Sequence, residues 1–301
     1  MPHALVIRAP GTNCDTEMVR AFTLAGCERC DLLHLDRLIA DPAAIESYDL
    51  IGFPGGFSYG DDVASGRVFA MRLRERLYEP LANAVHRGAC IIGACNGFQV
   101  LVQVGLLPGM NPERQRGAAT STTPHTPPRP TVALTDNIQN RFIDKWLRVE
   151  AVESSRCIWT KGLASRWHRS PTGAEEGADS RNSQHRPATG ATNPAMTLPI
   201  AHGEGRFVTD SPATLAALEA NHQVALRYID NDNGSQNRIA GICDPTGRVF
   251  GLMPHPERYL SWHHHPFATA LPEELKQGDT PGLTIFKNAV EAVTPARAPC
   301  H

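Results

Sequence analysis

Short apolar runs alternate with segments of helical periodicity over the N-terminal third of the chain, and this alternation constrains the fold more than any other feature. The apolar runs lie at residues 4–8, 31–35, 50–53 and 90–93. The helical segments lie at residues 15–25 and 67–85, and a third begins at Asn96. A short run that is apolar throughout is typical of a strand buried on both faces. Strands that alternate with helices predict right-handed crossovers and an α/β fold, with flanking helices around a central, mostly parallel sheet.

The rest of the chain adds further elements and two polar stretches. Extended segments are predicted at residues 145–152, 158–160, 196–201, 224–229, 239–243 and 249–253, and helices at 212–220 and 283–293. Pro80 should kink or split the 67–85 helix. Residues 111–130 and 166–195 hold too little apolar area to offset chain entropy, so we expect a polar loop and a disordered insertion. No internal repeat is visible, and we expect one domain over residues 1–301.

Composition excludes several classes of protein. A formal net charge of -2 gives no global field that would attract nucleic acid or a membrane surface. The N-terminus has no signal-peptide pattern, and no apolar run approaches the roughly 18 residues of a membrane span. The eight cysteines are not densely spaced as in small secreted proteins. We therefore expect a cytoplasmic protein with reduced thiols, in which Cys27 and Cys30 are small buried residues and not a redox or zinc pair.

The segment Gly93-Ala94-Cys95-Asn96-Gly97 carries the clearest chemical signal. It follows an apolar run and opens a helix, which is the context of a nucleophile elbow, where glycines leave room for a very tight turn. The N-terminus of the following helix would favour the thiolate of Cys95. Outside that context, a buried structural cysteine would explain the pattern equally well.

Two further segments supply what a cysteine nucleophile needs. His255 and Glu257 are two residues apart in a segment expected to be extended, so Glu257 can orient the imidazole of His255 as a base. Gly55 and Gly56 follow the 50–53 run and can turn a main-chain N–H toward an oxyanion, with the N–H of Asn96 as second donor. Taken singly, these segments are an ordinary surface histidine and a glycine turn. Together with Cys95 they indicate a Cys-His-Glu triad.

The motifs, in this order along the chain, resemble those of the class I glutamine amidotransferases. The wider segments around them resemble the glutaminase subunits of phosphoribosylformylglycinamidine synthase. These segments are residues 10–15, 55–61, 93–99, 201–207 and 253–258. The resemblance implies a flavodoxin-like amidotransferase fold, and the start at Met1 favours a separate subunit over part of a fused synthetase.

The resemblance also implies roles. The site would consist of Cys95, His255 and Glu257 as the catalytic triad, Gly56 and Asn96 as the oxyanion hole, and Gly55 and Gln99 as substrate contacts. Glutamine would be hydrolysed to glutamate and ammonia, and a synthetase partner would use the ammonia to convert formylglycinamide ribonucleotide to formylglycinamidine ribonucleotide in purine biosynthesis. ATP and magnesium would bind to that partner, while this chain would need no cofactor and no metal. A small bridging subunit is a further candidate partner.

Two other interpretations stay open at this point. One is a stand-alone cysteine hydrolase or repair enzyme on the related elbow-bearing fold, and the other is a non-catalytic subunit in which Cys95 only packs. The histidine run at 263–265 is a candidate for metal binding, although an exposed polar loop is the simpler interpretation.

Overall fold

The computed structural model describes residues 1–61, 63–109, 127–167 and 196–294. The predicted insertion from residue 168 onward and most of the predicted loop at 111–130 lie outside these residues. The strands are β1 (His3–Arg8), β2 (Arg29–His34), β3 (Leu50–Phe53), β4 (Cys90–Ala94), β5 (Val132–Thr135), β6 (Ile143–Ala151), β7 (Thr197–His202), β8 (Arg206–Thr209), β9 (Val224–Tyr228), β10 (Ile239–Cys243) and β11 (Val249–Leu252). The α-helices are α1 (Asp15–Ala25), α2 (Leu35–Ala40), α3 (Arg67–Arg76), α4 (Tyr78–His86), α5 (Asn96–Val104), α6 (Leu163–Trp167), α7 (Pro212–Ala220) and α8 (Pro281–Val293).

One sheet holds nine of these strands, in the order β2-β1-β3-β4-β11-β10-β9-β6-β7. The five strands from β2 to β11 pair in parallel. The alternation with helices predicts this for β1 to β4, whereas β11 follows β10 without a helix between them. All residues of β3, β4 and β11 are buried, which is the apolar pattern of strands covered on both faces. The fold class is thus confirmed: an α/β fold around a central sheet with flanking helices.

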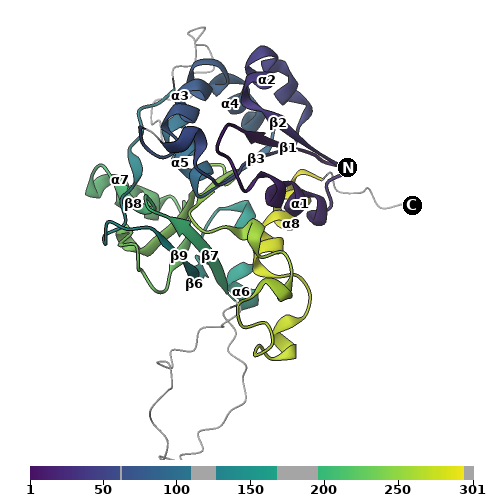
Figure 1. Ribbon diagram of the computed structural model, residues 1–301, viewed down its shortest axis with the longest axis vertical. Coiled ribbons are helices and arrows are strands. Elements are labelled where there is room, and N and C mark those ends of the chain that lie inside the picture. The colour runs from purple at the N-terminus through teal and green to yellow at the C-terminus, as the bar shows by residue number, and fades with distance from the viewer. Residues whose placement is uncertain (62, 110–126, 168–195, 295–301) are drawn as a thin grey trace, which may run out of the picture.

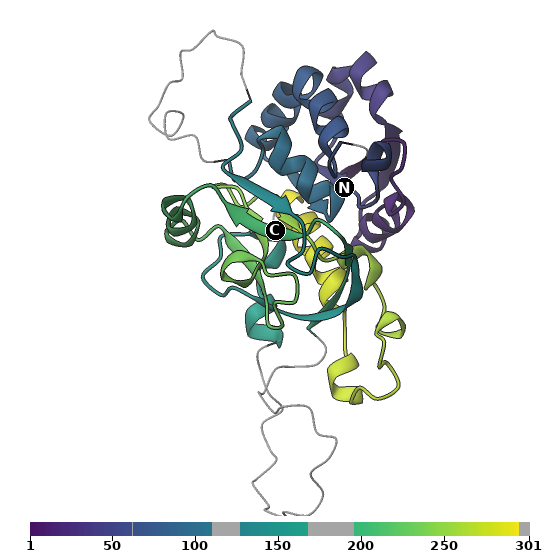
Figure 2. The same ribbon diagram turned by 60° about the vertical axis from the view of Figure 1, so that its left-hand side comes forward.

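The other side of the sheet is antiparallel. Strands β11, β10, β9, β6 and β7 each run opposite to the next, and β5 pairs with β8 in a small second sheet. Figures 1 and 2 show these teal and green segments together on one side of the molecule, with the purple and blue N-terminal segments on the other. The sequence predicted these strands individually, except for β5 and β8, but contained no local sign of their direction.

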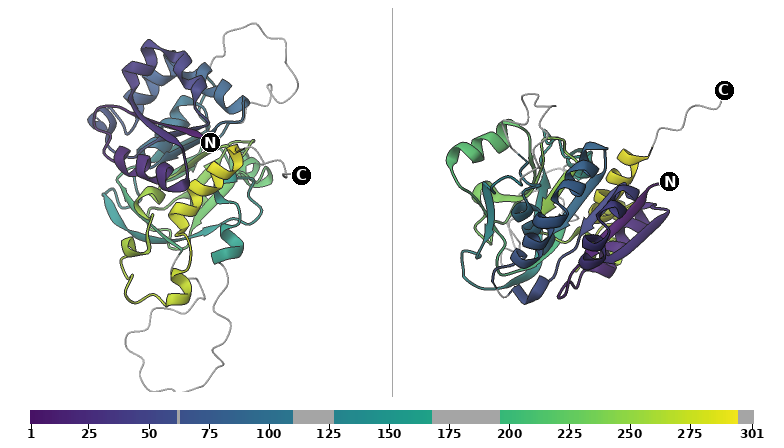
Figure 3. Two further views of the ribbon diagram at one scale, coloured as in Figure 1. Left: turned by 90° about the vertical axis from the view of Figure 1, so that its right-hand side faces the viewer. Right: turned by 90° about the horizontal axis from the view of Figure 1, so that it is seen from above.

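Helices cover the parallel strands from both sides. Figure 1 shows α2, α3, α4 and α5 on one side of β1 and β3, and α1 with α8 on the other, while Figure 3 shows α8 beside α1. The ring of Phe22 in α1 meets Phe286 in α8 edge to face, with centroids 5.2 Å apart. Among the described helices, none is long and apolar enough to cross a membrane.

The predicted break of the 67–85 segment is confirmed: it is split into α3 and α4 at Leu77, before Pro80, because a proline is tolerated in the first turn of a helix but not further inside one. Three other local predictions need correction. Residue Leu35 begins α2 and does not extend β2, and the Nδ1 atom of His34 caps that helix by accepting from the N–H of Asp36.

The second correction concerns residues 158–160, which form a 3-10 turn and not an extended segment. Trp159 lies between Phe250 and Phe286, and its indole N–H donates to the carbonyl of Arg248 at 2.9 Å. The packing of this one large ring decides the local backbone. Arg166 and Trp167, assigned to the insertion, are the end of α6.

Candidate active site

Cys95 lies in the turn between β4 and α5. Its φ of 52° and ψ of −110° are a combination that residues other than glycine rarely adopt. Its N–H donates to the carbonyl of Leu252 at 2.8 Å, which ties the turn to β11. A Cβ atom on Gly97 would lie 1.9 Å from the carbonyl oxygen of Phe53, so the start of α5 approaches β3 too closely for any other residue. The turn therefore has the geometry of a nucleophile elbow.

His255 and Glu257 form a buried pair directly after β11. The Nδ1 atom of His255 and Oε1 of Glu257 are 2.7 Å apart, and the two residues are 2% and 1% exposed. Glu257 reaches the imidazole through a 3-10 turn at Pro256–Arg258, and not along an extended segment as predicted, because Pro256 favours the start of a helical turn. Burial by itself lowers the pKa of His255. The charges of Glu257 and Cys95 together raise it by more than burial lowers it, so the pKa of His255 lies well above its ordinary value.

The sheet explains why these residues meet. Strands β3, β4 and β11 are neighbours and run in parallel, with Phe53 opposite Gly93 and Ala94 opposite Leu252. The carboxyl ends of parallel neighbours lie at the same edge of a sheet, which is where α/β proteins bind ligands. The loops that follow these three strands carry Gly56, Cys95 and His255, so three distant parts of the sequence form one site.

The main-chain N–H groups of Gly56 and Asn96, at this edge of the sheet, are among those that have no acceptor in the described residues. An isolated bridge between Gly56 and Thr12, with the N–H of Phe57 donating to the carbonyl of Gly11 at 2.9 Å, fixes the first of these loops. Free N–H groups next to a nucleophile are what an oxyanion hole requires. The assignment of Gly56 and Asn96 to that role remains a prediction.

The two predicted substrate contacts have structural tasks as well. A Cβ atom on Gly55 would lie 2.5 Å from Cε1 of His255, so the imidazole packs directly on this glycine. The Nε2 atom of Gln99 donates to the carbonyl of Glu204 at 2.6 Å, and its Oε1 atom accepts from the side-chain amide of Asn96 at 3.1 Å. Gln99 therefore holds the segment around Glu204 against α5, and its contact with substrate remains a prediction.

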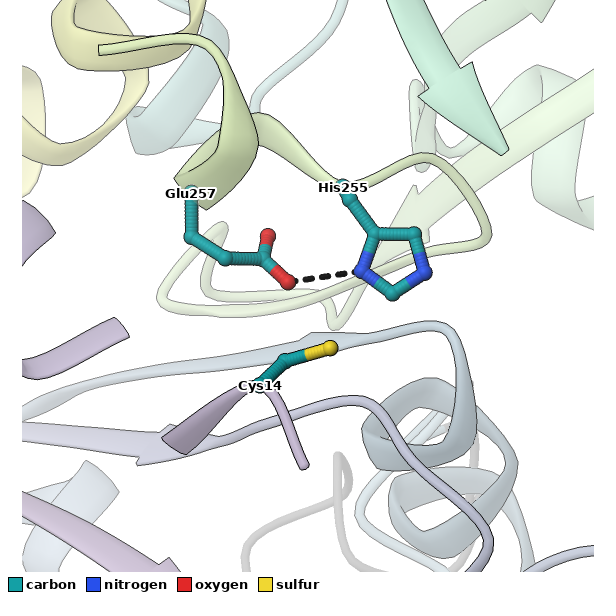
Figure 4. A group of neighbouring side chains, drawn as sticks. All are labelled: Cys14, His255 and Glu257. Atoms are coloured by element: carbon teal, nitrogen blue, oxygen red, sulfur yellow. Dashed lines mark hydrogen bonds and ion pairs between the residues drawn. The ribbon is translucent and has the colours of Figure 1, made fainter. Parts of the chain in front are cut away.

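Cys14 is a neighbour of the triad to which the sequence assigned no role. Figure 4 shows its sulfur pointing toward the pair formed by His255 and Glu257, and one ligand atom from each of the three residues lies within 4.8 Å of the others. The guanidinium of Arg258 donates to Sγ of Cys14 at 3.0 Å. That positive charge would repel a bound cation, and Nδ1 of His255 is already paired with Glu257. We therefore assign Cys14 to the packing of the triad and not to a metal site.

His202, the last residue of β7, is the other residue that lacked a predicted role. It is 3% exposed, and the neighbouring carbonyl of Ala201 lies 3.6 Å from Sγ of Cys95. Its Nδ1 atom lies 3.1 Å from Oδ1 of Asn137. In the sequence, His202 is marked only by its position in the 201–207 segment, and Asn137 belongs to no motif.

The sequence contained two other candidate groups, the cysteine pair Cys27 and Cys30 and the histidine run at 263–265. Burial is the main influence that raises the pKa of the Cys27 and Cys30 thiols to about 12, which makes them poor nucleophiles. His263 and His264 are exposed, but His265 is buried against the rings of Trp146 and Tyr259. The prediction of an exposed polar loop is therefore wrong at His265, because aromatic packing draws that ring inward.

Comparison with known proteins agrees with this geometry. Residues 1–188 and 181–293 match the family model of the CobB/CobQ-like glutamine amidotransferase domain. With its elbow cysteine and its buried histidine and glutamate, the chain is a glutamine amidotransferase by fold and by site.

Individual relatives narrow the assignment. The phosphoribosylformylglycinamidine synthase subunit PurQ from a strain of Methanococcus maripaludis is 37% identical over 310 residues, covering 97% of both chains. PurQ from Dehalococcoides mccartyi is 35% identical and covers 95% of this chain and 96% of its own. A chain in the structure of PurLQS from Thermotoga maritima, 30% identical, superposes with a TM-score of 0.62 over 97% of this chain and 99% of that one. This chain belongs to the PurQ family.

Proposed function

We propose that this chain is the glutaminase subunit of a phosphoribosylformylglycinamidine synthase and that Cys95, His255 and Glu257 are its catalytic triad. The observation that supports this most strongly is the common position of their loops, and of Gly56, at the carboxyl edge of β3, β4 and β11. A thiol, an imidazole with its carboxylate and two free N–H groups are together the parts that amide hydrolysis through a covalent intermediate needs.

The mechanism follows from these positions. The thiolate of Cys95 attacks the carboxamide carbon of glutamine, and the N–H groups of Gly56 and Asn96 stabilise the oxyanion that forms. His255 gives its proton to the departing nitrogen, the C–N bond breaks, and ammonia leaves a glutamyl thioester behind. His255 then takes a proton from water as the water attacks the thioester. The C–S bond breaks and glutamate leaves, which restores the thiolate of Cys95 and the protonated His255. Glu257 holds the imidazole in orientation throughout.

Ammonia needs a protected route to its acceptor. In bulk water at neutral pH most ammonia takes up a proton and ceases to be a nucleophile. The chain therefore acts in complex with a synthetase subunit that binds ATP, magnesium and formylglycinamide ribonucleotide and makes formylglycinamidine ribonucleotide. This chain itself uses no cofactor, acts in the cytoplasm, and works as one amidotransferase domain whose main sheet includes strands from His3 to Leu252.

A chloroketone analogue of glutamine tests the substrate assignment. The analogue should alkylate Cys95, and free glutamine should slow that alkylation. Iodoacetamide serves as the control, because it reports thiol reactivity without recognition of glutamine. Alkylation by both reagents without protection by glutamine would favour a hydrolase of other substrates, and failure of both would favour a packing role for Cys95.

The variant Cys95→Ser tests the division of labour. In the complex reconstituted with the synthetase, glutamine-dependent product formation should fall by roughly 10³-fold or more. Activity supported by added ammonia should stay at the wild-type level, because the synthetase site is untouched. Loss of both activities would contradict a role limited to ammonia supply.

A further inference from the structure

A cavity of about 560 Å³ lies between α3, α5 and β5, next to the candidate active site. Gln99 is part of its lining, but Cys95, Gly56 and His255 are not, so the cavity is separate from the groups that would react with glutamine. Ligand pockets typically enclose roughly 300–1,000 Å³, so this one has room for a small molecule of its own. The mechanism above makes no use of it.

The lining of this cavity carries an excess of positive charge. Three arginines line it, Arg67, Arg74 and Arg129, against one acidic residue, Glu204. Three positive charges and one negative charge leave a surplus of two. The carboxylate of Glu204 accepts from the main-chain N–H of Ser65 at 3.4 Å and is not paired with an arginine of the described residues. The cavity therefore favours an anionic ligand.

Arg74 fixes the shape of the cavity. One arm of its guanidinium donates to the carbonyl of Gln103, at the end of α5, at 2.7 Å. Both arms also donate to the carbonyls of residues 127–128, at 3.2 and 3.3 Å. The segment that leads to Arg129 and β5 is thereby tied to α3. Within the described part of the chain, neutral carbonyls are the acceptors of Arg74, so its positive charge is not neutralised by a carboxylate.

Arg67 and Arg129 supply donors that are available to a ligand. Both side chains are exposed, and neither has a hydrogen bond or an ion pair with a described residue. Arg67 is the first residue of α3, whereas Arg129 precedes β5, so they belong to the two segments that Arg74 joins. A guanidinium presents its N–H groups as a fork that matches two oxygens of a phosphate. The free donors of the cavity therefore fit a phosphate group.

The remaining lining includes an apolar wall, formed by Val102 of α5 and by Val132 and Leu134 of β5. Val102 and Val132 are 2% and 4% exposed, and Leu134 is half-buried. Such a wall binds a ring or an alkyl group, which an inorganic ion does not have. A phosphate ion alone would also leave most of a cavity of this size to water. The ligand should therefore carry an apolar body as well as its charge.

We propose that this cavity binds a phosphate monoester with an aromatic body, such as a nucleoside monophosphate, with its phosphate at Arg67 and Arg129 and its ring against the apolar wall. The inference goes beyond the proposed glutaminase function, because none of the triad residues takes part in it. It gives the chain a second small-molecule ligand besides glutamine.

Calorimetric titration of the full chain with adenosine monophosphate tests the site, with adenosine and inorganic phosphate as partial probes. We expect the monophosphate to bind with a Kd below about 1 mM and each partial probe to bind at least about tenfold more weakly, since each fills only one part of the cavity. No binding of the monophosphate at about 5 mM would overturn the proposal. Equal affinity for the monophosphate and for either partial probe would also overturn it.

Two arginine variants test where the phosphate lies. Arg67→Gln and Arg129→Gln each remove one fork from an exposed side chain, and each should weaken binding of the monophosphate about fivefold at low salt. The loss should shrink as salt is raised, because salt screens exposed charges. Arg76→Gln is the matched control, since Arg76 is exposed on the same helix as Arg67 but does not line the cavity. Unchanged affinity in both cavity variants, or an equal loss in Arg76→Gln, would contradict the proposal.

Competition with glutamine separates this cavity from the glutaminase site. The experiment uses Cys95→Ser, in which turnover of glutamine should be lost. Saturating glutamine should leave the affinity for the monophosphate within about twofold of its value without glutamine. Displacement by glutamine would place the phosphate in the glutamine site and overturn the inference. Because binding is measured without turnover, a failure of the proposed glutaminase function would leave this result unaffected.

Discussion

At the scale of single residues, the proposed mechanism predicts that the pair of His255 and Glu257 sets the pH range of activity. After burial, the carboxylate of Glu257 is the strongest influence on the pKa of His255, and it raises that pKa. In Glu257→Gln the pKa of His255 should therefore fall. Because His255 must be protonated to release ammonia, the alkaline limb of kcat/KM for glutamine should move toward acid by about one pH unit or more.

The pH profile of the reconstituted complex checks this. Glu204→Gln is the matched control, since its carboxylate accepts from the N–H of Ser65 at 3.4 Å and does not act on His255. Its alkaline limb should coincide with that of wild type. A slower Glu257→Gln enzyme with an unmoved limb would show that Glu257 orients the imidazole without setting its charge.

The residues that the sequence predicted are those whose role shows in a local motif. Cys95 lies between two glycines at the start of a helix, and His255 and Glu257 are two residues apart. Asn137 and Cys14 could not be assigned, because their contacts join segments 65 and 244 residues apart. No spacing along the chain encodes such a contact, which exists only once the sheet has formed.

At the scale of elements, the elbow depends on the close approach of α5 to β3. The methyl group of Gly97→Ala would meet the carbonyl oxygen of Phe53 at 1.9 Å, and that atom belongs to the main chain and cannot rotate away. The helix must shift or the strand must move. We expect Gly97→Ala to lower the free energy of unfolding by about 3 kcal/mol, measured by urea denaturation.

Gly203→Ala is the comparison for this substitution. The nearest atom to its added methyl group is Cδ2 of Phe142 at 4.0 Å, an ordinary contact, so its stability should stay within about 0.5 kcal/mol of wild type. Equal losses in the two variants would mean that backbone freedom and not close approach explains Gly97.

The elements also differ in how well the sequence predicted them. The parallel strands β3 and β4 were recognisable because each is apolar throughout, and helices separate the strands from β1 to β4 along the chain. The direction of β6, β7 and β9 was not recognisable, since strand pairing depends on partners far along the chain. The short strands β5 and β8 are half-buried, so their apolar pattern is weak.

At the scale of the whole molecule, we expect the partner that receives ammonia to cover the site. Large apolar side chains are exposed on the loops around it: Phe57 is 46% exposed, Ile138 61% and Phe142 51%. The rings of Phe57 and Phe142 stack with centroids 6.2 Å apart, although they come from different loops. Phe57 directly follows the loop glycine Gly56, and Phe142 lies beside Gly203. Ile138 follows Asn137, whose N–H donates to the carbonyl of Gly203 at 2.8 Å. We infer that these three side chains form an apolar rim next to the site. Exposed apolar groups gathered in this way mark protein interfaces.

We therefore expect Ile138→Asp and Phe142→Asp each to weaken binding of the synthetase subunit by about tenfold or more, because a charge at the centre of an interface loses its water. Leu24→Asp is the control, since Leu24 is 46% exposed on α1, outside this rim. Calorimetric titration measures the affinity, and alkylation of Cys95 by the glutamine chloroketone shows whether the isolated site is intact. Wild-type affinity in both rim variants would place the synthetase on another face, and ammonia would then have to leave the site by a route other than the rim.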